Sequence, residues 1–110
     1  MNREMMMITD DKAIENRLKK FCKKWGIREL AVFGSALRED FGPESDVDFL
    51  VSFREGQKPG WPHILDMQEE LSKLVKNRVD VVDRTNLEKS ENYIKRKHIL
   101  ESAQVIYVER

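Results

Sequence analysis

Three aspartates have the type and spacing to bind metal ions. Asp46 and Asp48 stand at the start of an apolar run and are separated by one residue. Because successive strand side chains point to opposite faces, these two carboxylates share one face, roughly 6.6–6.8 Å apart along the strand. Asp80 lies in a later apolar run, Val79–Val82. Carboxylates are ligands of hard cations such as Mg2+, so the set indicates a metal site.

A glycine–serine pair ahead of these aspartates has the character of a phosphate site. Gly34-Ser35 follows the predicted strand Glu29–Phe33 and is separated from Asp46 by ten residues. Glycine permits a tight turn, and the backbone N–H groups and the serine hydroxyl of such a turn can donate to phosphate. Cation ligands together with a phosphate cradle predict nucleotidyl transfer.

Each of these features also has a purely structural interpretation. Half-exposed strands alternate polar and apolar residues, so the Asp-Val-Asp tripeptide alone is weak evidence. The glycine–serine pair alone could be any turn from a strand to a helix, and Asp80 alone could be an exposed strand residue. The four features in this order are more specific than any one of them, which favours the functional interpretation.

The spacing Gly34-Ser35-x10-Asp46-x-Asp48, with Asp80 on a later strand, resembles the signature of DNA polymerase β-like nucleotidyltransferases. The short chain is most similar to the minimal nucleotidyltransferase (MNT) family, and the resemblance runs from about residue 14 to residue 108. It implies an α/β (α+β) fold, a mixed β-sheet flanked by helices, that binds a nucleoside triphosphate and two Mg2+ ions. Members often carry Ala-Arg-Gly after Gly-Ser-x, whereas residues 36–40 here are Ala-Leu-Arg-Glu-Asp.

The resemblance also implies roles for individual residues. The catalytic and metal-binding residues would be Asp46, Asp48 and Asp80, the last completing the catalytic metal site. The residues that bind the nucleotide would be Gly34, Ser35, Arg38 and Ser45.

Many members of the MNT family are antitoxins that pair with a HEPN-type RNase toxin and transfer AMP to one of its tyrosines. The resemblance therefore implies Mg-dependent transfer of AMP from ATP to a hydroxyl of a partner toxin in a hetero-oligomer, with a homodimer as the alternative for the chain alone. A chain of this length has no room for a separate acceptor-binding domain, so the acceptor is expected on another chain. The alternative is a catalytically silent subunit that neutralises the toxin by occlusion.

Length and charge limit the other classes. The 110 residues suffice for one domain with one modest core, and residues 1–8 are expected to be a frayed end. Twenty basic and twenty acidic residues cancel, which gives no global preference for nucleic acid or an anionic membrane. A third interpretation, a nucleic-acid-binding module, depends only on the lysines within residues 19–24 and the basic run 95–98, which solvated helix faces also explain.

Cys22 is the only cysteine, so no intrachain disulfide is expected, which fits a reducing cytosol. It lies on the apolar side of a predicted helix, where a buried filler is favoured over a reactive thiol. No apolar run is long enough to span a membrane, and the first residues lack the apolar core of a signal peptide. We therefore expect a cytoplasmic protein.

Hydrophobic periodicity predicts alternating helices and strands. A helix is expected from a cap at 9–11 to about residue 24, with Gly26 ending it, and a short helix from 35 to about 40. Another runs from 62 to a stop at 77, and a further helical region begins at the capping box Thr85–Glu88. The predicted strands cover 29–33, 47–53, 79–82 and 105–108, with Val47, Phe49, Val51 and Phe53 facing a core.

Overall fold

The computed structural model describes residues 12–34, 46–56 and 60–109 of the chain. Its elements are α2 (Lys12–Trp25), β1 (Ile27–Phe33), β2 (Val47–Phe53), α3 (Trp61–Val75), β3 (Val79–Asp83), α4 (Arg84–Glu88), α5 (Tyr93–Ser102) and β4 (Gln104–Val108). The four strands form one sheet in the order β3-β2-β1-β4. Strands β2 and β3 are parallel and the other pairs are antiparallel, so the predicted mixed sheet flanked by helices is confirmed.

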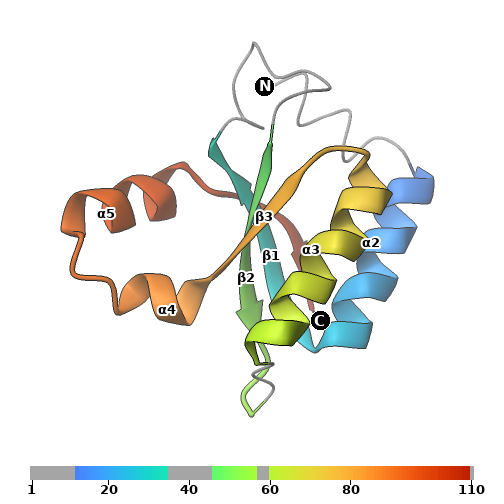
Figure 1. Ribbon diagram of the computed structural model, residues 1–110, viewed down its shortest axis with the longest axis horizontal. Helices are drawn as coiled ribbons and strands as arrows, with labels where there is room; N and C mark the ends of the chain where they lie inside the picture. The colour runs from blue at the N-terminus through green and yellow to red at the C-terminus, as the bar shows by residue number, and fades with distance from the viewer. Residues whose placement is uncertain (1–11, 35–45, 57–59, 110) are drawn as a thin grey trace.

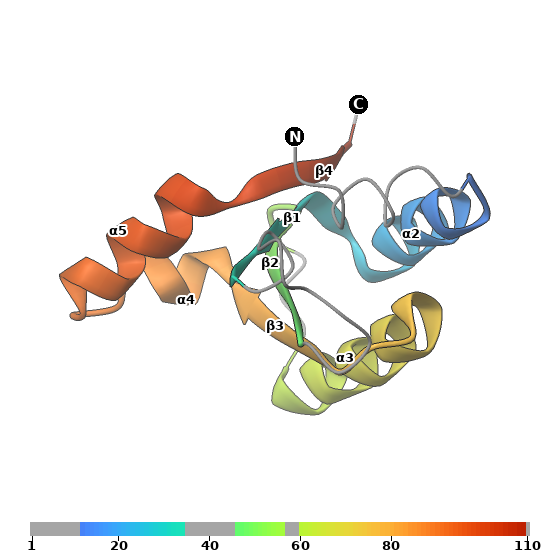
Figure 2. The same ribbon diagram turned by 90° about the horizontal axis from the view of Figure 1, so that it is seen from above.

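Helices cover both faces of the sheet. Helices α2 and α3 lie on one side, and α4 and α5 lie on the other (Figures 1 and 2). Since β1 is antiparallel to β2 and β2 is parallel to β3, the end of β1 and the starts of β2 and β3 share one edge of the sheet, at the top of Figure 1. We call this edge the carboxylate edge, because Asp46, Asp48 and Asp80 all lie near it.

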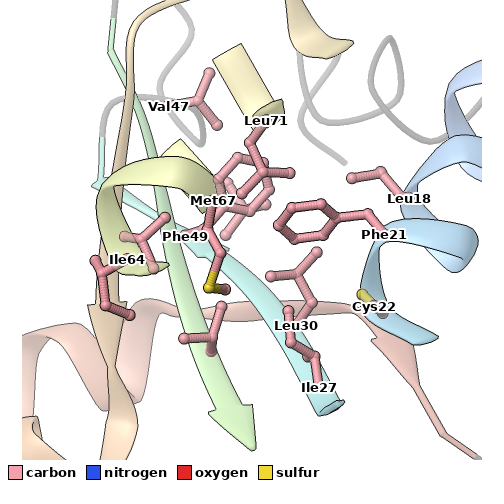
Figure 3. Packing of buried hydrophobic residues seen from close by; sticks show 13 residues of the cluster. Leu18, Phe21, Cys22, Ile27, Leu30, Val47, Phe49, Ile64, Met67 and Leu71 are labelled. Carbon is pink, nitrogen blue, oxygen red and sulfur yellow. The ribbon is translucent and has the colours of Figure 1, made fainter. Parts of the chain in front are cut away.

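The main core lies between the sheet and helices α2 and α3. Val47, Phe49 and Val51 of β2 are completely buried in it, which confirms the predicted core face of this strand. Phe53 packs against the same cluster and is partly buried. Side chains from both helices meet the strand there, among them Phe21 and Met67 (Figure 3). Each large apolar side chain buried in this way contributes about 1.5–3 kcal/mol to folding.

A smaller cluster lies on the opposite face of the sheet, under α4 and α5. Its buried members are Ala31, Phe33, Leu50, Leu87 and Ile99. The alternation of β2 puts Asp48 on the same face as Leu50, one step nearer the carboxylate edge. Apolar packing on both faces therefore holds β2 in place, and with it Asp48, the second residue of this strand.

Most element boundaries agree with the sequence-based expectations. Strand β2 has the predicted bounds, and α2 ends next to Gly26, whose φ of +68° is left-handed as predicted for a helix stop. Strand β1 begins two residues earlier than predicted, because Ile27 pairs with Phe53 at the far end of the ladder. The predicted helix over residues 35–40 lies outside the described residues. None of the helices in the described part of the chain is long and apolar enough to cross a bilayer.

The predicted capping box at Thr85 is wrong. The carboxylate of Asp83 accepts a hydrogen bond from the Thr85 N–H at 2.9 Å, so Asp83 is the N-cap and α4 begins at Arg84. The helical region is also two helices, because Asn92 caps a second one by accepting from Lys95 N–H at 3.0 Å. The last residue of β3, Asp83, is thus the N-cap of α4. Both aspartate and threonine are good N-cap residues, so the sequence pattern alone does not show which of the two begins the helix.

Candidate functional site

The candidate residues on the described part of the chain come together at the carboxylate edge. Gly34 directly follows β1, Asp46 directly precedes β2, and Asp80 is the second residue of β3. Asp48, the second residue of β2, pairs in register with Phe33 on one side and with Asp80 on the other. It is therefore the central residue of the site.

Asp48 and Asp80 occupy equivalent positions on neighbouring parallel strands. Their side chains consequently point to the same face of the sheet, and the strands are about 4.8 Å apart. Asp48 is half-buried and Asp80 is exposed. These two carboxylates start from backbone positions that one cation can bridge.

Gly34 and Asp48 are in direct contact. The backbone of Gly34 has a φ of +73°, a left-handed conformation that glycine adopts without strain. A Cβ atom built on Gly34 would collide with Oδ2 of Asp48. The glycine expected from the turn is therefore required for a second reason, the close approach of a carboxylate.

Asp46 has a different partner. The guanidinium Nε of Arg78 lies 3.0 Å from its Oδ1, with 82% of the Arg78 side chain and 53% of the Asp46 side chain exposed. The Val47 N–H donates to the Arg78 carbonyl at 2.8 Å, which ties the two strand starts together. Arg78 is thus a site residue that the sequence interpretation missed. The available signal was its position, since it precedes β3 as Asp46 precedes β2.

The three aspartates have the chemistry of an Mg2+ site, since all are hard oxygen donors on adjacent strands. Nevertheless, within residues 12–34, 46–56 and 60–109 no group of three or more His, Cys, Asp or Glu side chains is close enough to hold a metal ion. Asp46 contacts Arg78, while Asp48 contacts Gly34. The metal-binding role of the set stays a prediction.

The remaining predicted nucleotide-binding residues, Ser35, Arg38 and Ser45, lie outside the described residues. Their roles likewise stay predictions.

A side chain of α3 holds the strand that carries Asp80. Strand β3 is an edge strand of the sheet, and its Val81 N–H donates to Oε1 of Gln68 at 3.0 Å. This bond satisfies a backbone donor next to Asp80 that an edge strand leaves without a strand partner. Gln68 is a second residue that the sequence interpretation missed, because nothing local relates it to β3.

Cys22 is not a candidate nucleophile. Its side chain is completely buried in the main core, as predicted. Burial raises the pKa of the Cys22 thiol from 9.0 to about 12, because the apolar surroundings disfavour the thiolate. The thiol is therefore protonated at neutral pH, and any group transfer by this chain does not pass through it.

Comparison with known sequences identifies relatives. The profile of the nucleotidyltransferase domain family matches residues 14–106. The protein adenylyltransferase MntA of Thermococcus cleftensis is 38% identical over 69 residues, which cover 63% of this chain and 68% of that protein. A Methanocaldococcus jannaschii protein named as a candidate protein adenylyltransferase, MJ1379, is 31% identical over 84 residues, covering 76% of this chain and 84% of that protein.

Solved structures share the fold. A structure described as a candidate minimal nucleotidyltransferase is 27% identical with a TM-score of 0.63 and covers 84% of this chain and 89% of its own. A toxin–antitoxin structure with AMP-PNP is 16% identical with a TM-score of 0.66, covering 87% of this chain and 74% of that chain. The complex of a tri-AMPylated HEPN toxin of Shewanella oneidensis with its MNT antitoxin is also 16% identical, with a TM-score of 0.60 and coverage of 89% and 72%. With the profile match over most of its length, this chain belongs to the nucleotidyltransferase domain family.

Proposed function

We propose that this nucleotidyltransferase transfers AMP from ATP to a hydroxyl group, a tyrosine, of a partner HEPN-type toxin and thereby acts as its antitoxin. The observation that carries the proposal is the position of Asp48, in contact with Gly34 on one side and in register with Asp80 on the other. Gly34, which we propose contacts the phosphates, and the carboxylates of Asp48 and Asp80 are therefore neighbours at one edge of the sheet. The names of the relatives and the AMPylated toxin of the Shewanella complex support AMP transfer and a HEPN-type partner.

The chemistry is an in-line displacement at the α-phosphorus of ATP. The acceptor oxygen forms the new P–O bond, pyrophosphate leaves with the electrons of the broken P–O bond, and the hydroxyl proton passes to a base. Two bound Mg2+ ions would neutralise charge on the entering and leaving oxygens. In this chain Asp46, Asp48 and Asp80 would hold the ions.

The other roles follow from position. Asp80, on the edge strand β3, would face the acceptor and would also accept the proton of the hydroxyl. The backbone at Gly34 and the hydroxyl of Ser35 would orient the phosphates. Arg38 and Ser45 are proposed as further contacts of the nucleotide. A nucleotide substrate is supported by the toxin–antitoxin structure that contains AMP-PNP.

The remaining parts of the proposal concern partners and surroundings. We propose a hetero-oligomer with the toxin in the cytoplasm, where a single cysteine stays reduced. Nucleic acid is not proposed as a direct partner. The chain is neutral overall, and Lys19 and Lys24 of the α2 lysines form ion pairs with Glu15 and Glu70.

A second function, neutralisation by occlusion without chemistry, is favoured by one observation. The described carboxylates do not form a group that could hold a metal ion as they stand. A protein that only covers the toxin needs no such group.

The experiment uses the purified chain and the proposed partner, a HEPN-type toxin. Incubation with ATP and Mg2+ followed by intact-mass spectrometry should show AMP adducts on the toxin, at a tyrosine in the peptide map. Asp48→Asn should abolish the adducts. Asp66→Asn, which changes an exposed aspartate of α3, is the matched control and should leave them unchanged. A toxin that stays unmodified yet is fully inhibited at stoichiometric ratio would contradict AMP transfer and establish occlusion.

A further inference from the structure

The two aspartates that flank Val47 have different neighbours. Asp48 lies against Gly34, on the β1 side of β2, whereas Asp46 is paired with Arg78, on the β3 side. A shared metal ion requires both carboxylates to direct oxygens toward a common point. Asp46 instead contacts a cation, the guanidinium of Arg78.

The contact of Arg78 with Asp46 is built into the strand pairing. Val47 and Val79 are register partners, and the hydrogen bond from Val47 N–H to the Arg78 carbonyl fixes the residues in front of them side by side. The guanidinium then reaches Oδ1 of Asp46 at 3.0 Å through Nε. A second cation at the same carboxylate would be repelled by the first, so Arg78 and a divalent ion compete for Asp46.

The pair is also easy to break. Both side chains are largely exposed, and exposed ion pairs are weak because water competes with them. A divalent ion can therefore displace the guanidinium at a small cost. The ion pair between Arg78 and Asp46 is therefore weak enough for a divalent ion to replace it.

We propose that Arg78 is a placeholder cation, which holds Asp46 in the metal-free protein and must release it when a divalent ion binds. Arg78 thereby lowers the affinity of the carboxylate edge for metal ions in the absence of substrate. The inference rests on the metal site of the proposed function, and it adds a residue that sets the occupancy of that site. From the usual strength of an exposed ion pair, loss of the guanidinium should tighten metal binding about two- to fivefold.

The test measures Mn2+ binding without nucleotide, by titration calorimetry at low ionic strength. Arg78→Gln removes the charge and keeps most of the side-chain length, and it should bind Mn2+ two- to fivefold more tightly than the unchanged protein. Arg78→Lys, which keeps a cation, should stay close to the unchanged protein. The matched control is Lys76→Asn, because Lys76 precedes the same strand and the described part of the chain shows no ion pair for it.

The Lys76→Asn control separates the effect of the Arg78–Asp46 contact from the effect of removing one positive charge near the carboxylate edge. Lys76 has a left-handed φ of 60°, which asparagine tolerates, and its replacement removes one positive charge near the edge. Lys76→Asn should change the Mn2+ affinity much less than Arg78→Gln does. Equal tightening in both variants, or none in Arg78→Gln, would overturn the placeholder role.

A double-mutant cycle separates this inference from the proposed function. In an Asp46→Asn background, Arg78→Gln should have no further effect on Mn2+ binding, because the competitor has lost its target. If Asp46→Asn weakens binding but Arg78→Gln changes nothing in the unmodified chain, the placeholder role fails and the metal site stands. If none of the proteins binds Mn2+, both the metal site and the placeholder role are wrong. Thermal unfolding of each variant confirms that it is folded.

Discussion

A Cβ atom on residue 34 would collide with Oδ2 of Asp48, so the Asp48 carboxylate keeps its present position only while residue 34 is glycine. The contact joins the turn after β1 to the second residue of β2. It makes Gly34, proposed to contact the phosphates, a neighbour of Asp48, a proposed metal ligand. Changes at Gly34 should therefore act on Asp48 as well as on the turn.

The first prediction concerns Gly34→Ala. The new Cβ must push the Asp48 carboxylate aside, and displacements of about 1 Å at a reacting site cost on the order of 10²-fold in rate. We expect AMP transfer to fall by about that factor.

The control is Gly56→Ala, because Gly56 also has a positive φ, +80°, but a Cβ there would meet nothing within 4 Å. Both variants should lose about 1–2 kcal/mol of unfolding free energy from the left-handed backbone, and only Gly34→Ala should lose activity beyond that. Equal activity in the two variants would show that the contact with Asp48 has no role in catalysis.

The second prediction separates Asp80 from Asp48. Asp48 is central to the edge, whereas Asp80 lies on the edge strand β3 and is proposed to face the acceptor. Asp80→Asn should therefore reduce AMP transfer by at least tenfold while changing the affinity for Mg-ATP little. Asp48→Asn should reduce both. Transfer is measured by intact mass, and affinity by calorimetry with Mg2+ and with EDTA. Parallel losses of binding and transfer in Asp80→Asn would contradict the acceptor-side role.

The sequence was informative where a pattern is local. The alternation from Val47 to Phe53 gives the bounds of β2 and identifies Val47, Phe49 and Val51 as residues of the main core, because successive side chains of a strand point to opposite faces. The pairing of Asp48 with Asp80 is different, since it depends on the register of two strands separated by α3. No local signal specifies that register, so the contact of Gln68 with β3 was not predictable. Arg78 could be related to Asp46 only by its equivalent position in front of the neighbouring strand.

A third prediction concerns Gln68. Its side-chain oxygen accepts from the Val81 N–H, beside Asp80. Gln68→Leu keeps the approximate size and removes the acceptor, which should lower the unfolding free energy by about 1 kcal/mol and speed hydrogen exchange at the Val81 amide. Gln68→Glu keeps an acceptor and should preserve the protection of that amide. AMP transfer should fall in Gln68→Leu with little change in the affinity for Mg-ATP. If exchange at Val81 is the same in both variants, Gln68 does not hold the strand.

The last prediction follows from the buried thiol of Cys22. Its pKa is raised from 9.0 to about 12 in the folded protein, so above pH 9 the unfolded chain releases a proton that the folded chain retains. Stability due to this group is fully present below pH 9 and decreases as the pH rises toward 12, by up to about 1.4 kcal/mol per pH unit.

Urea unfolding at pH 8 and pH 10 tests this linkage, with Cys22→Ala as the control that lacks the thiol. Other groups also titrate in this range, so the informative quantity is the difference between the two proteins. The unchanged protein should lose about 1.4 kcal/mol more unfolding free energy between these pH values than Cys22→Ala does. The variant should be less stable at both, because a smaller side chain leaves a cavity in the core between α2 and the sheet. Equal losses in both proteins would mean that the thiol ionises as readily in the folded state as in the unfolded state, and that α2 does not seal this core from water.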